Sequence, residues 1–500
     1  MSKVNSSEIG FEKEIWKAAD VLRGNMDASE YKHVILGLIF LKFISDKFED
    51  KYNKLLEEGD GFEENRDEYA AENIFYVPKE ARWEEIAKNT RKEEIGQIID
   101  NSMREIEKEN KTLKNILPKN FAKPELNKKR LGEVVDLFTN IKMSDHGDQK
   151  DILGRAYEYC LSKFAEKEGK NAGEFYTPSS VVKTLVEIIQ PYDGRVYDPC
   201  CGSGGMFVQS KNFIENHQGN INNISVYGQD SNPTTWKMAK MNLAIRGIES
   251  NLGKHDADTF ANDLHPTLKA DFILANPPFN LKNWGQEHLT DDVRWKYGIP
   301  PKGNANYAWI QHMIYHLAPN GKLGLVLANG SLSSATSGEG KIRENIIKDD
   351  LIEGIVALPT QLFYTTGIPV CLWIINRNKK QKGKTLFIDA RERGTMISRK
   401  LRELSEDEVK TIGKAFKDFN EGNLKEEKGF SAIATAEKIS KHDYILTPGR
   451  YVGFKDIEDD GIPFEEKMGK LTKELDELFK KSNELEKDIR KSLGEIGFEF

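Results

Sequence analysis

The chain has 500 residues, of which 38% are hydrophobic and 31% charged, and its formal net charge is −7. This length predicts at least two domains plus appendages, and the composition excludes disordered, collagen-like and membrane-embedded proteins. The longest dense apolar run, Val34 to Leu41, is far shorter than the roughly 20 residues of a membrane-spanning helix. The negative charge argues against coating of nucleic acid by bulk electrostatics, so any DNA contact is expected to be local or shared with a partner.

Four cysteines and an N-terminus without a secretory apolar region predict a reducing, cytoplasmic environment. Over residues 11–165 the apolar positions recur at helical spacing, for example within 15–22, 34–43 and 152–164. The sequence therefore predicts an α-helical N-terminal domain over residues 1–168.

The segment 174–179, Glu-Phe-Tyr-Thr-Pro-Ser, joins this helical region to the next domain. Its Pro-Ser pair fits a linker that caps a helix beginning near Val181. The same segment also fits a lid over a bound ligand, and the residues alone do not distinguish these two interpretations.

Residues 169–452 alternate short apolar strands with helical segments. The expected strands are 195–197, 226–229, 272–275, 323–327 and 352–358. This alternation predicts an α/β domain with a mostly parallel, doubly wound sheet. Ligands bind such sheets at the carboxyl ends of their strands.

The first strand leads into a glycine-rich turn, in the sequence VYDPCCGSGGMFV. Asp198 ends the strand, and Gly202, Gly204 and Gly205 precede a helix. Glycine permits positive φ and lacks Cβ, so backbone N–H groups can approach a ligand closely. A turn of this kind alone would also suit a tight strand–helix connection.

Further carboxylates follow at the expected ends of the next two strands. Asp230 ends the second strand, where an acid can accept hydrogen bonds from both ribose hydroxyls. Asp256 and Asp258 stand where the third strand should end, and either can accept an adenine amino group; we prefer Asp258. Each acid singly fits a helix cap or turn residue, but three strand-end sites in order favour a nucleoside ligand.

The expected strand 272–275 runs directly into Asn276-Pro277-Pro278-Phe279. Two prolines fix two φ angles and remove two donors, so the strand must stop and carbonyl oxygens remain available. Asn276 and Pro277 then offer two neutral acceptors to an exocyclic amine, whose nitrogen is a poor nucleophile until both hydrogens are held. Phe279 can stack on a base swung out of a duplex. The alternative is a Pro-Pro loop that only ends a strand.

The last segment, 453–500, carries a heptad seam with polar residues at two positions. The seam comprises Met468, Leu471, Leu475, Leu478, Ser482, Leu485, Ile489, Ser492 and Ile496. A seam of this length needs a partner face, from the chain's own helices or from another subunit. We assign no role to the loops at Gly338–Gly340 and 365–369, and no residue to a metal.

DPCCGSGG followed by NPPF resembles the adenine-N6 DNA methyltransferases. GEFYTP, the start IWKAADVLRGNMDASEYKHVILGLIFLKFISDKFE, and AYEYCLSKFA resemble specifically the modification subunit of type I restriction-modification systems, over residues 10–450. The resemblance implies a Rossmann-like domain that transfers methyl from S-adenosylmethionine to adenine N6 in double-stranded DNA, with a docking tail. It also implies two modification subunits around one specificity subunit, which a restriction subunit can join.

The cofactor-binding residues so implied are Glu174, Phe175, Tyr176, Thr177, Pro178, Ser179, Asp198, Gly202, Ser203, Gly204, Gly205, Asp230 and Asp258. The family usually has Glu where this chain has Asp230, which puts the ribose contact in some doubt. A Gly-Asp-Thr-Leu pattern of the family resembles residues 257–260 and underlies the preference for Asp258. The family also often has Ala at Cys200, a small-for-small change.

Two rival hypotheses remain from the residues. A methyltransferase for a protein glutamine or an RNA base also uses Asn-Pro-Pro-aromatic, although such enzymes are typically compact and lack a helical domain of about 165 residues. A non-catalytic scaffold would not need an intact Asn276, Pro277 and Phe279.

Overall fold

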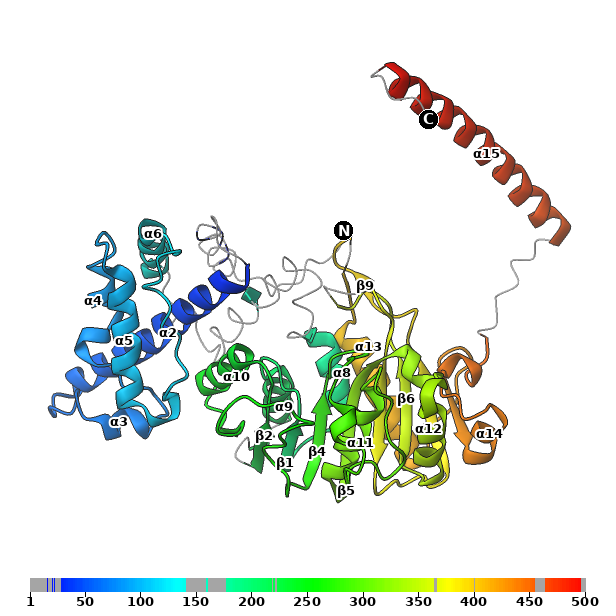
Figure 1. Ribbon diagram of the computed structural model, residues 1–500, viewed down its shortest axis with the longest axis horizontal. Coiled ribbons are helices and arrows are strands. Elements are labelled where there is room, and N and C mark those ends of the chain that lie inside the picture. Colours follow the sequence, from blue (N-terminus) through cyan, green and yellow to red (C-terminus); the bar gives the residue numbers. More distant parts are fainter. Residues whose placement is uncertain are drawn as a thin grey trace. The chain divides into compact units, whose positions relative to one another are not determined.

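The computed structural model describes residues 16, 20, 22, 28–140, 159–160, 177–217, 219–220, 223–363, 367–399, 401–454 and 464–495 (Figure 1). The chain divides into two units, Met1–Gly453 and Phe454–Phe500. Among the helices in these described ranges, none has the length and apolar character to cross a membrane.

The described N-terminal region is helical, as predicted. Its helices are α2 (Ala28–Glu58), α3 (Arg66–Ala70), α4 (Trp83–Ala87), α5 (Ile95–Glu109) and α6 (Lys128–Thr139). They share one core that includes the fully buried Phe40, Ile99 and Phe138. The expected helix over 152–164 falls outside the described residues except for 159 and 160, which are helical.

A nine-stranded sheet forms the centre of the larger unit, in the order β11-β8-β6-β7-β5-β4-β1-β2-β3. Its strands are β1 (Gly194–Asp198), β2 (Ile224–Gly228), β3 (Ser250–Asn251), β4 (Ala270–Ala275), β5 (Leu317–Ala328), β6 (Ile352–Ala357), β7 (Val370–Asn376), β8 (Lys384–Asp389) and β11 (Ser431–Thr435). β7 runs antiparallel to β5 and β6, and β11 antiparallel to β8. The other strands are parallel, so the carboxyl ends of β1, β4, β6 and β8 meet at one edge.

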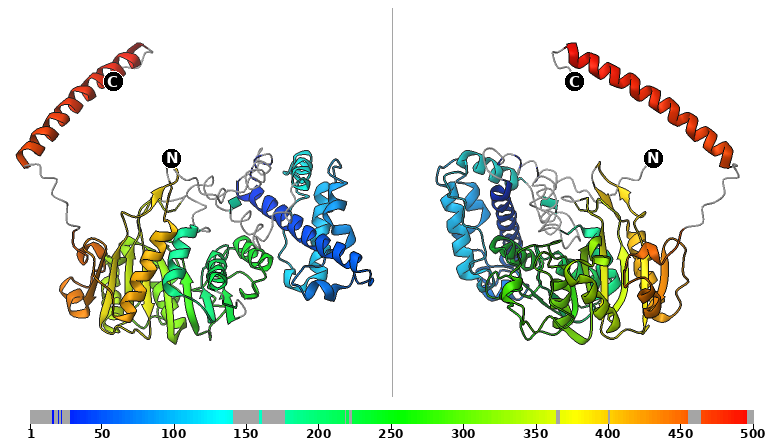
Figure 2. Two further views of the ribbon diagram at one scale, coloured as in Figure 1. Left: turned by 180° about the vertical axis from the view of Figure 1, so that it is seen from behind. Right: turned by 45° about the vertical axis from the view of Figure 1, so that its right-hand side comes forward.

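Alternating side chains of the strands enter two different cores, because successive Cβ atoms of a strand point to opposite faces. Val196 and Leu274 pack with α8 (Ser179–Ile189), α9 (Gly205–Asn216), α10 (Pro233–Ile245) and α13 (Glu406–Glu421). Tyr197 and Ile273 pack with α11 (Asn306–His316), α12 (Glu339–Lys348) and α14 (Ala436–Lys441). Figure 2 shows helices on both faces, which is the predicted doubly wound arrangement.

The structure corrects three sequence-based expectations. β3 has only two residues, so Asp256 and Asp258 lie in a loop rather than at a strand end. α8 begins at Ser179, two residues before the expected start. The charged region after Arg377, to which no strand was assigned, contains β8, β11 and a small hairpin, β9 (Thr395–Met396) and β10 (Arg402–Glu403).

The smaller unit contains one long described helix, α15 (Phe464–Glu495). Its apolar seam side chains are exposed, with Leu475 at 49% and Leu478 at 57%. The described part of Phe454–Phe500 holds no second helix to cover them, so within this unit the predicted seam has no partner face.

Replacing Trp373 tests the assignment of β7 to the sheet interior. The side chain is fully buried in the core on one face of the sheet, and its Nε1 donates to Ser331 Oγ over 3.1 Å. Trp373→Ala should lower the free energy of unfolding by about 3–5 kcal/mol in urea titrations, because it opens a large cavity. Val293→Ala, at a side chain that is 77% exposed, is the control. Equal midpoints for the two variants would contradict this placement.

Candidate functional site

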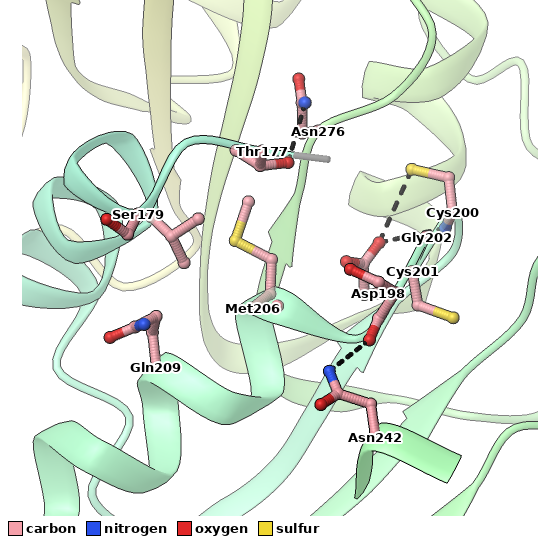
Figure 3. A pocket seen from close by; sticks show the side chains of 13 residues that line it. Thr177, Ser179, Asp198, Cys200, Cys201, Gly202, Met206, Gln209, Asn242 and Asn276 are labelled. Atoms are coloured by element: carbon pink, nitrogen blue, oxygen red, sulfur yellow. Dashed lines mark hydrogen bonds between the residues drawn. The ribbon is translucent and has the colours of Figure 1, made fainter. Parts of the chain in front are cut away.

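A pocket lies at the carboxyl edge of the sheet, between the ends of β1 and β4 and the starts of α8 and α9 (Figure 3). It encloses about 560 Å³, part of it open to solvent. Its lining residues are Thr177, Ser179, Val182, Asp198, Cys200, Cys201, Gly202, Ser203, Gly205, Met206, Gln209, Asn242 and Asn276. The structure therefore brings together the glycine turn, Asn276 of the Asn-Pro-Pro-Phe segment and the end of the 174–179 segment.

The glycine turn has the conformation for which its glycines are required. Gly202 and Gly204 have φ of 54° and 81°, in the left-handed region that side chains rarely adopt. A Cβ on Gly205 would stand in open space. The turn thus leaves room for a ligand beside the first N–H groups of α9, which have no partner within the helix.

Contacts from outside the turn hold it in place. Asn242 Nδ2 donates to the Ser203 carbonyl over 2.7 Å, and Arg246 donates to Asn242 Oδ1. Asn242 also lines the pocket, although sequence reasoning did not identify it. A lone Asn in the middle of a predicted helix carries no local signal for this role.

Asp198 is 1% exposed and lies on the pocket wall. Its Oδ1 accepts a hydrogen bond from the Cys200 backbone N–H over 3.0 Å. Burial and, to a smaller extent, the nearby Asp230 carboxylate raise the pKa of Asp198 to about 7, against the lowering effect of the hydrogen bonds from Cys200. An approaching cation would favour its ionised form.

Asp230 accepts a hydrogen bond from the glycine turn and does not line the pocket. Its Oδ2 accepts from the Gly202 N–H over 3.0 Å, and its Oδ1 accepts from the Asn232 N–H over 2.9 Å. Burial raises the pKa of Asp230 to about 6. The carboxylate therefore joins the end of β2 to the turn after β1.

Asp258 is exposed and lies in the loop before β4, outside the pocket lining. Its Oδ1 accepts from the backbone N–H groups of Phe260 and Ala261, over 2.9 and 2.8 Å. This is the turn-capping behaviour that was the alternative to ligand binding. The loop is tied to the end of β2, because the Ala257 N–H donates to the Asp230 carbonyl over 2.9 Å.

Asn276 follows β4 directly and reaches the pocket. Its Nδ2 donates to Thr177 Oγ1 over 2.9 Å, and Figure 3 shows the two side chains together. Its Oδ1 is buried and accepts no hydrogen bond from any described residue. Thr177 and Ser179 line this pocket and Pro178 is buried outside its lining, whereas Glu174, Phe175 and Tyr176 lie outside the described residues.

The rest of the motif forms a rigid corner. Pro277 is buried, Pro278 and Phe279 are half-buried, and the Phe279 ring meets Phe363 edge-on with centroids 5.6 Å apart. None of the described residues donates a hydrogen bond to the Pro277 carbonyl.

Three asparagines fix the corner from the other side. Asn280 has φ of 54°, and its side-chain oxygen accepts from Asn304 Nδ2 and Asn306 Nδ2 over 3.2 and 3.0 Å. Asn306 Oδ1 in turn accepts from the Asn280 N–H over 3.1 Å. Sequence reasoning missed these residues, although an Asn after Phe279 suits a left-handed turn position.

The buried Arg294 guanidinium joins the segment that follows Asn276–Phe279 to the loop that contains Asp258. Arg294 donates to both Asp292 oxygens, to the carbonyls of Thr259 and Phe260, and to His312 Nδ1. All five of its N–H hydrogens are used, so this side chain holds the loop before β4 firmly.

A buried polar network extends from this guanidinium. His312 Nε2 contacts the Tyr197 hydroxyl over 3.1 Å, and His316 Nε2 contacts Asp263 Oδ2 over 2.8 Å. The ligand atoms of Asp263, His312 and His316 lie within 4.8 Å of one another. Each histidine nitrogen already pairs with a protein group, so we describe the cluster as a structural network.

The raised pKa of Asp198 sets the sign of a pH effect on stability. Between its ordinary value of 3.8 and about 7 the folded state binds a proton that the unfolded state has released. The free energy of unfolding should therefore fall as pH rises through this window, by at most about 1.4 kcal/mol per pH unit. Asp198→Asn should flatten this slope in urea titrations at pH 5, 6 and 7. Exposed Asp291→Asn is the control, and equal slopes for both variants would contradict the burial argument.

Solved structures share this architecture. The chain superimposes on a crystal structure of the type I restriction-modification system methyltransferase subunit from Streptococcus thermophilus with a TM-score of 0.77 and 26% identity, covering 89% of this chain and 99% of that one. A second structure, of a type I restriction-modification system, gives a TM-score of 0.62 at 18% identity, covering 97% and 99%. That second likeness concerns the fold alone.

Sequence comparisons identify the family. Residues 148–460 match the family model N-6 DNA Methylase, and residues 11–138 match the HsdM N-terminal domain. The chain is 51% identical to the type I restriction enzyme HindI methylase subunit of Haemophilus influenzae, covering 81% of this chain and 93% of the relative. It is 41% identical to the MjaIX methylase subunit of Methanocaldococcus jannaschii, covering 98% and 92%. The chain therefore belongs to the N-6 DNA methylase family, among the methylase subunits of type I restriction enzymes, and is an adenine-specific DNA methyltransferase.

Proposed function

We propose that the pocket beside the glycine turn binds S-adenosylmethionine and that Asn276 and Pro277 present adenine N6 to it. The single observation that carries this proposal is the Asn276 Oδ1 atom, which is buried without a partner on the wall of that pocket. A buried acceptor without a partner costs about 1–3 kcal/mol, and a substrate N–H would remove that cost.

The pocket fits a ligand that carries both signs of charge. The start of α9 offers unpaired N–H groups to a carboxylate, and Asp198 offers a carboxylate to an ammonium group. The open space at Gly205 admits ligand atoms against the backbone. The cofactor would supply a methyl group already activated on a sulfonium.

The chain's own residues then hold the acceptor amine. Asn276 Oδ1 and the Pro277 carbonyl accept the two N6 hydrogens, so the nitrogen lone pair is drawn out of conjugation with the ring. Thr177 Oγ1 accepts from Asn276 Nδ2 and so keeps the amide oxygen aimed at the substrate. Phe279 stacks on the extruded base. Because neutral acceptors position the amine, no group has to remove a proton before the transfer; the methylated nitrogen then releases one proton to solvent as the thioether product leaves.

Asp230 and Asp258 remain our proposed contacts to ribose and adenine. Each Asp230 oxygen accepts one protein hydrogen bond and so retains a lone pair for a hydroxyl. At Asp258 the two backbone bonds go to Oδ1, and no described residue donates to Oδ2. Glu174, Phe175 and Tyr176 remain proposed lid residues.

We further propose that the chain works in the cytoplasm as two copies around one specificity subunit, which selects the DNA target and which a restriction subunit can join. The relatives at 51% and 41% identity are named as methylase subunits of restriction enzymes, which supports this assembly. Those names favour DNA as substrate over a protein glutamine or an RNA base. In our proposal residues 1–168 and 169–452 form the helical and methyltransferase domains, and 453–500 the docking tail.

Removing the Asn276 amide should abolish methyl transfer without removing the pocket. For Asn276→Ala we expect transfer from tritiated S-adenosylmethionine to plasmid DNA to fall on the order of 100-fold or more. Cofactor affinity, measured by calorimetry, should change little. Asn378→Ala, at an exposed asparagine, is the control and should behave like the unaltered protein. Activity that survives in Asn276→Ala would refute the assigned role.

Charges in the α15 seam should prevent assembly. The exposed Leu475 and Leu478 are expected to meet apolar side chains of the specificity subunit, so Leu475→Asp with Leu478→Asp should abolish its co-purification. Lys473→Asp reverses the charge of an exposed residue of the same helix and serves as control. Retained assembly in the double variant would show that the seam is not the docking surface.

A further inference from the structure

A basic hairpin projects from the sheet edge that carries the active site. Residues 391–403 read RERGTMISRKLRE and hold five cationic and two acidic side chains, in a chain whose net charge is −7. Arg391 pairs with Asp389 and Lys400 lies outside the described residues, so the exposed Arg399 is the cation on which our proposal depends. We propose that this basic hairpin grips the DNA duplex beside the extruded adenine, with its cations on the phosphates and its apolar tip against a groove. The inference rests on the proposed function and adds the element that holds the substrate.

The topology places the basic hairpin at the correct edge. It follows β8, which runs parallel to β6 and hence in the same direction as β1 and β4. It therefore leaves the sheet at the edge where Asp198 and Asn276 lie. Three strands separate β8 from β4, which corresponds to about 19 Å, a distance that one bound duplex can span. Figures 1 and 2 show β9 extending beyond this edge in every view.

Two contacts connect the basic hairpin to the catalytic corner. The Arg402 N–H donates to the Gln361 carbonyl over 2.8 Å. Two residues later, Phe363 meets the Phe279 ring edge-on at 5.6 Å. The segment 361–363 thus contacts both the hairpin and Phe279, the proposed base-stacking residue.

The basic hairpin is held rigidly, so its charges are arranged before a ligand arrives. β9 and β10 pair antiparallel, and the Ile397 N–H closes the tip by donating to the Leu401 carbonyl over 2.9 Å. At the base, the Gly394 N–H donates to Glu408 Oε1 over 2.7 Å. Preorganisation of this kind reduces the entropy cost of binding.

The surface chemistry of the tip fits DNA. Met396 and Ile397 are 40% and 55% exposed, and the exposed Arg399 follows two residues later. Apolar side chains flanked by arginines are the combination that DNA-bending proteins press into a groove, where arginines contact phosphates. The positive charge is local, which agrees with a chain that cannot attract DNA through its net charge.

Reversing one charge on the basic hairpin tests the proposal. The complex with the specificity subunit is used, and a fluorescent duplex containing the target site is titrated by anisotropy at several salt concentrations. Arg399→Glu should weaken DNA binding at least tenfold, lower the magnitude of the salt slope by about 1–2, and raise KM for DNA with little change in kcat. Cofactor affinity should stay unchanged.

A matched control lies at the far end of β8, the strand that leads into the hairpin. Lys384→Glu reverses an exposed charge at the amino end of β8, at the opposite edge of the sheet. It should alter DNA affinity less than twofold. Met396→Ser with Ile397→Ser should reduce the fluorescence rise of 2-aminopurine at the target position, which reports base extrusion.

The outcomes separate the hypotheses. Equal effects of Arg399→Glu and Lys384→Glu would overturn the proposal, as would loss of the specificity subunit from Arg399→Glu, which would identify a protein interface instead. If the unaltered complex binds the duplex but transfers no methyl group, the proposed function fails while the anisotropy comparison still decides the role of the basic hairpin.

Discussion

The site depends on one amide whose nitrogen is satisfied and whose oxygen is not. Thr177 Oγ1 accepts a hydrogen bond from Asn276 Nδ2, which fixes the amide and leaves its buried oxygen without a donor among the described residues. The protein tolerates this unsatisfied acceptor because the prolines, Asn280 and Asn306 over-determine the surrounding backbone. In the proposed function, the free energy that this unsatisfied acceptor costs the folded protein is recovered when a substrate N–H binds to it.

The carboxyl edge of the sheet has two regions, each suited to a different kind of ligand. The turns after β1 and β2 carry glycines and buried carboxylates suited to a small, charged ligand. The segments after β4, β6 and β8 carry the proline corner, Phe363 and the basic hairpin, which suit a large anionic substrate. Because the carboxyl ends of parallel strands lie at one edge of the sheet, two ligands can bind side by side there.

Much of this arrangement could be predicted from the sequence because it is local. A strand followed by glycines or prolines at fixed spacing predicts a turn at that point. Asp198 and Asn276 were therefore placed correctly at strand ends. What could not be predicted depends on contacts between distant segments. Asn242, Arg294 and the Asn280–Asn306 pair act through partners that the fold brings together, and nothing in their neighbours indicates this. The loop of Asp258 was misplaced because a two-residue β3 is too short to show a period of two.

Asp198, on the pocket wall, and Asp230, which holds the glycine turn, bind their protons more tightly than exposed carboxyls do, because burial raises the pKa of Asp198 to about 7 and that of Asp230 to about 6. A cationic group of a ligand beside Asp198 would favour the ionised carboxylate, so binding of such a ligand would release a proton near neutral pH. The affinity for that ligand should then rise with pH over the range in which the free energy of unfolding falls.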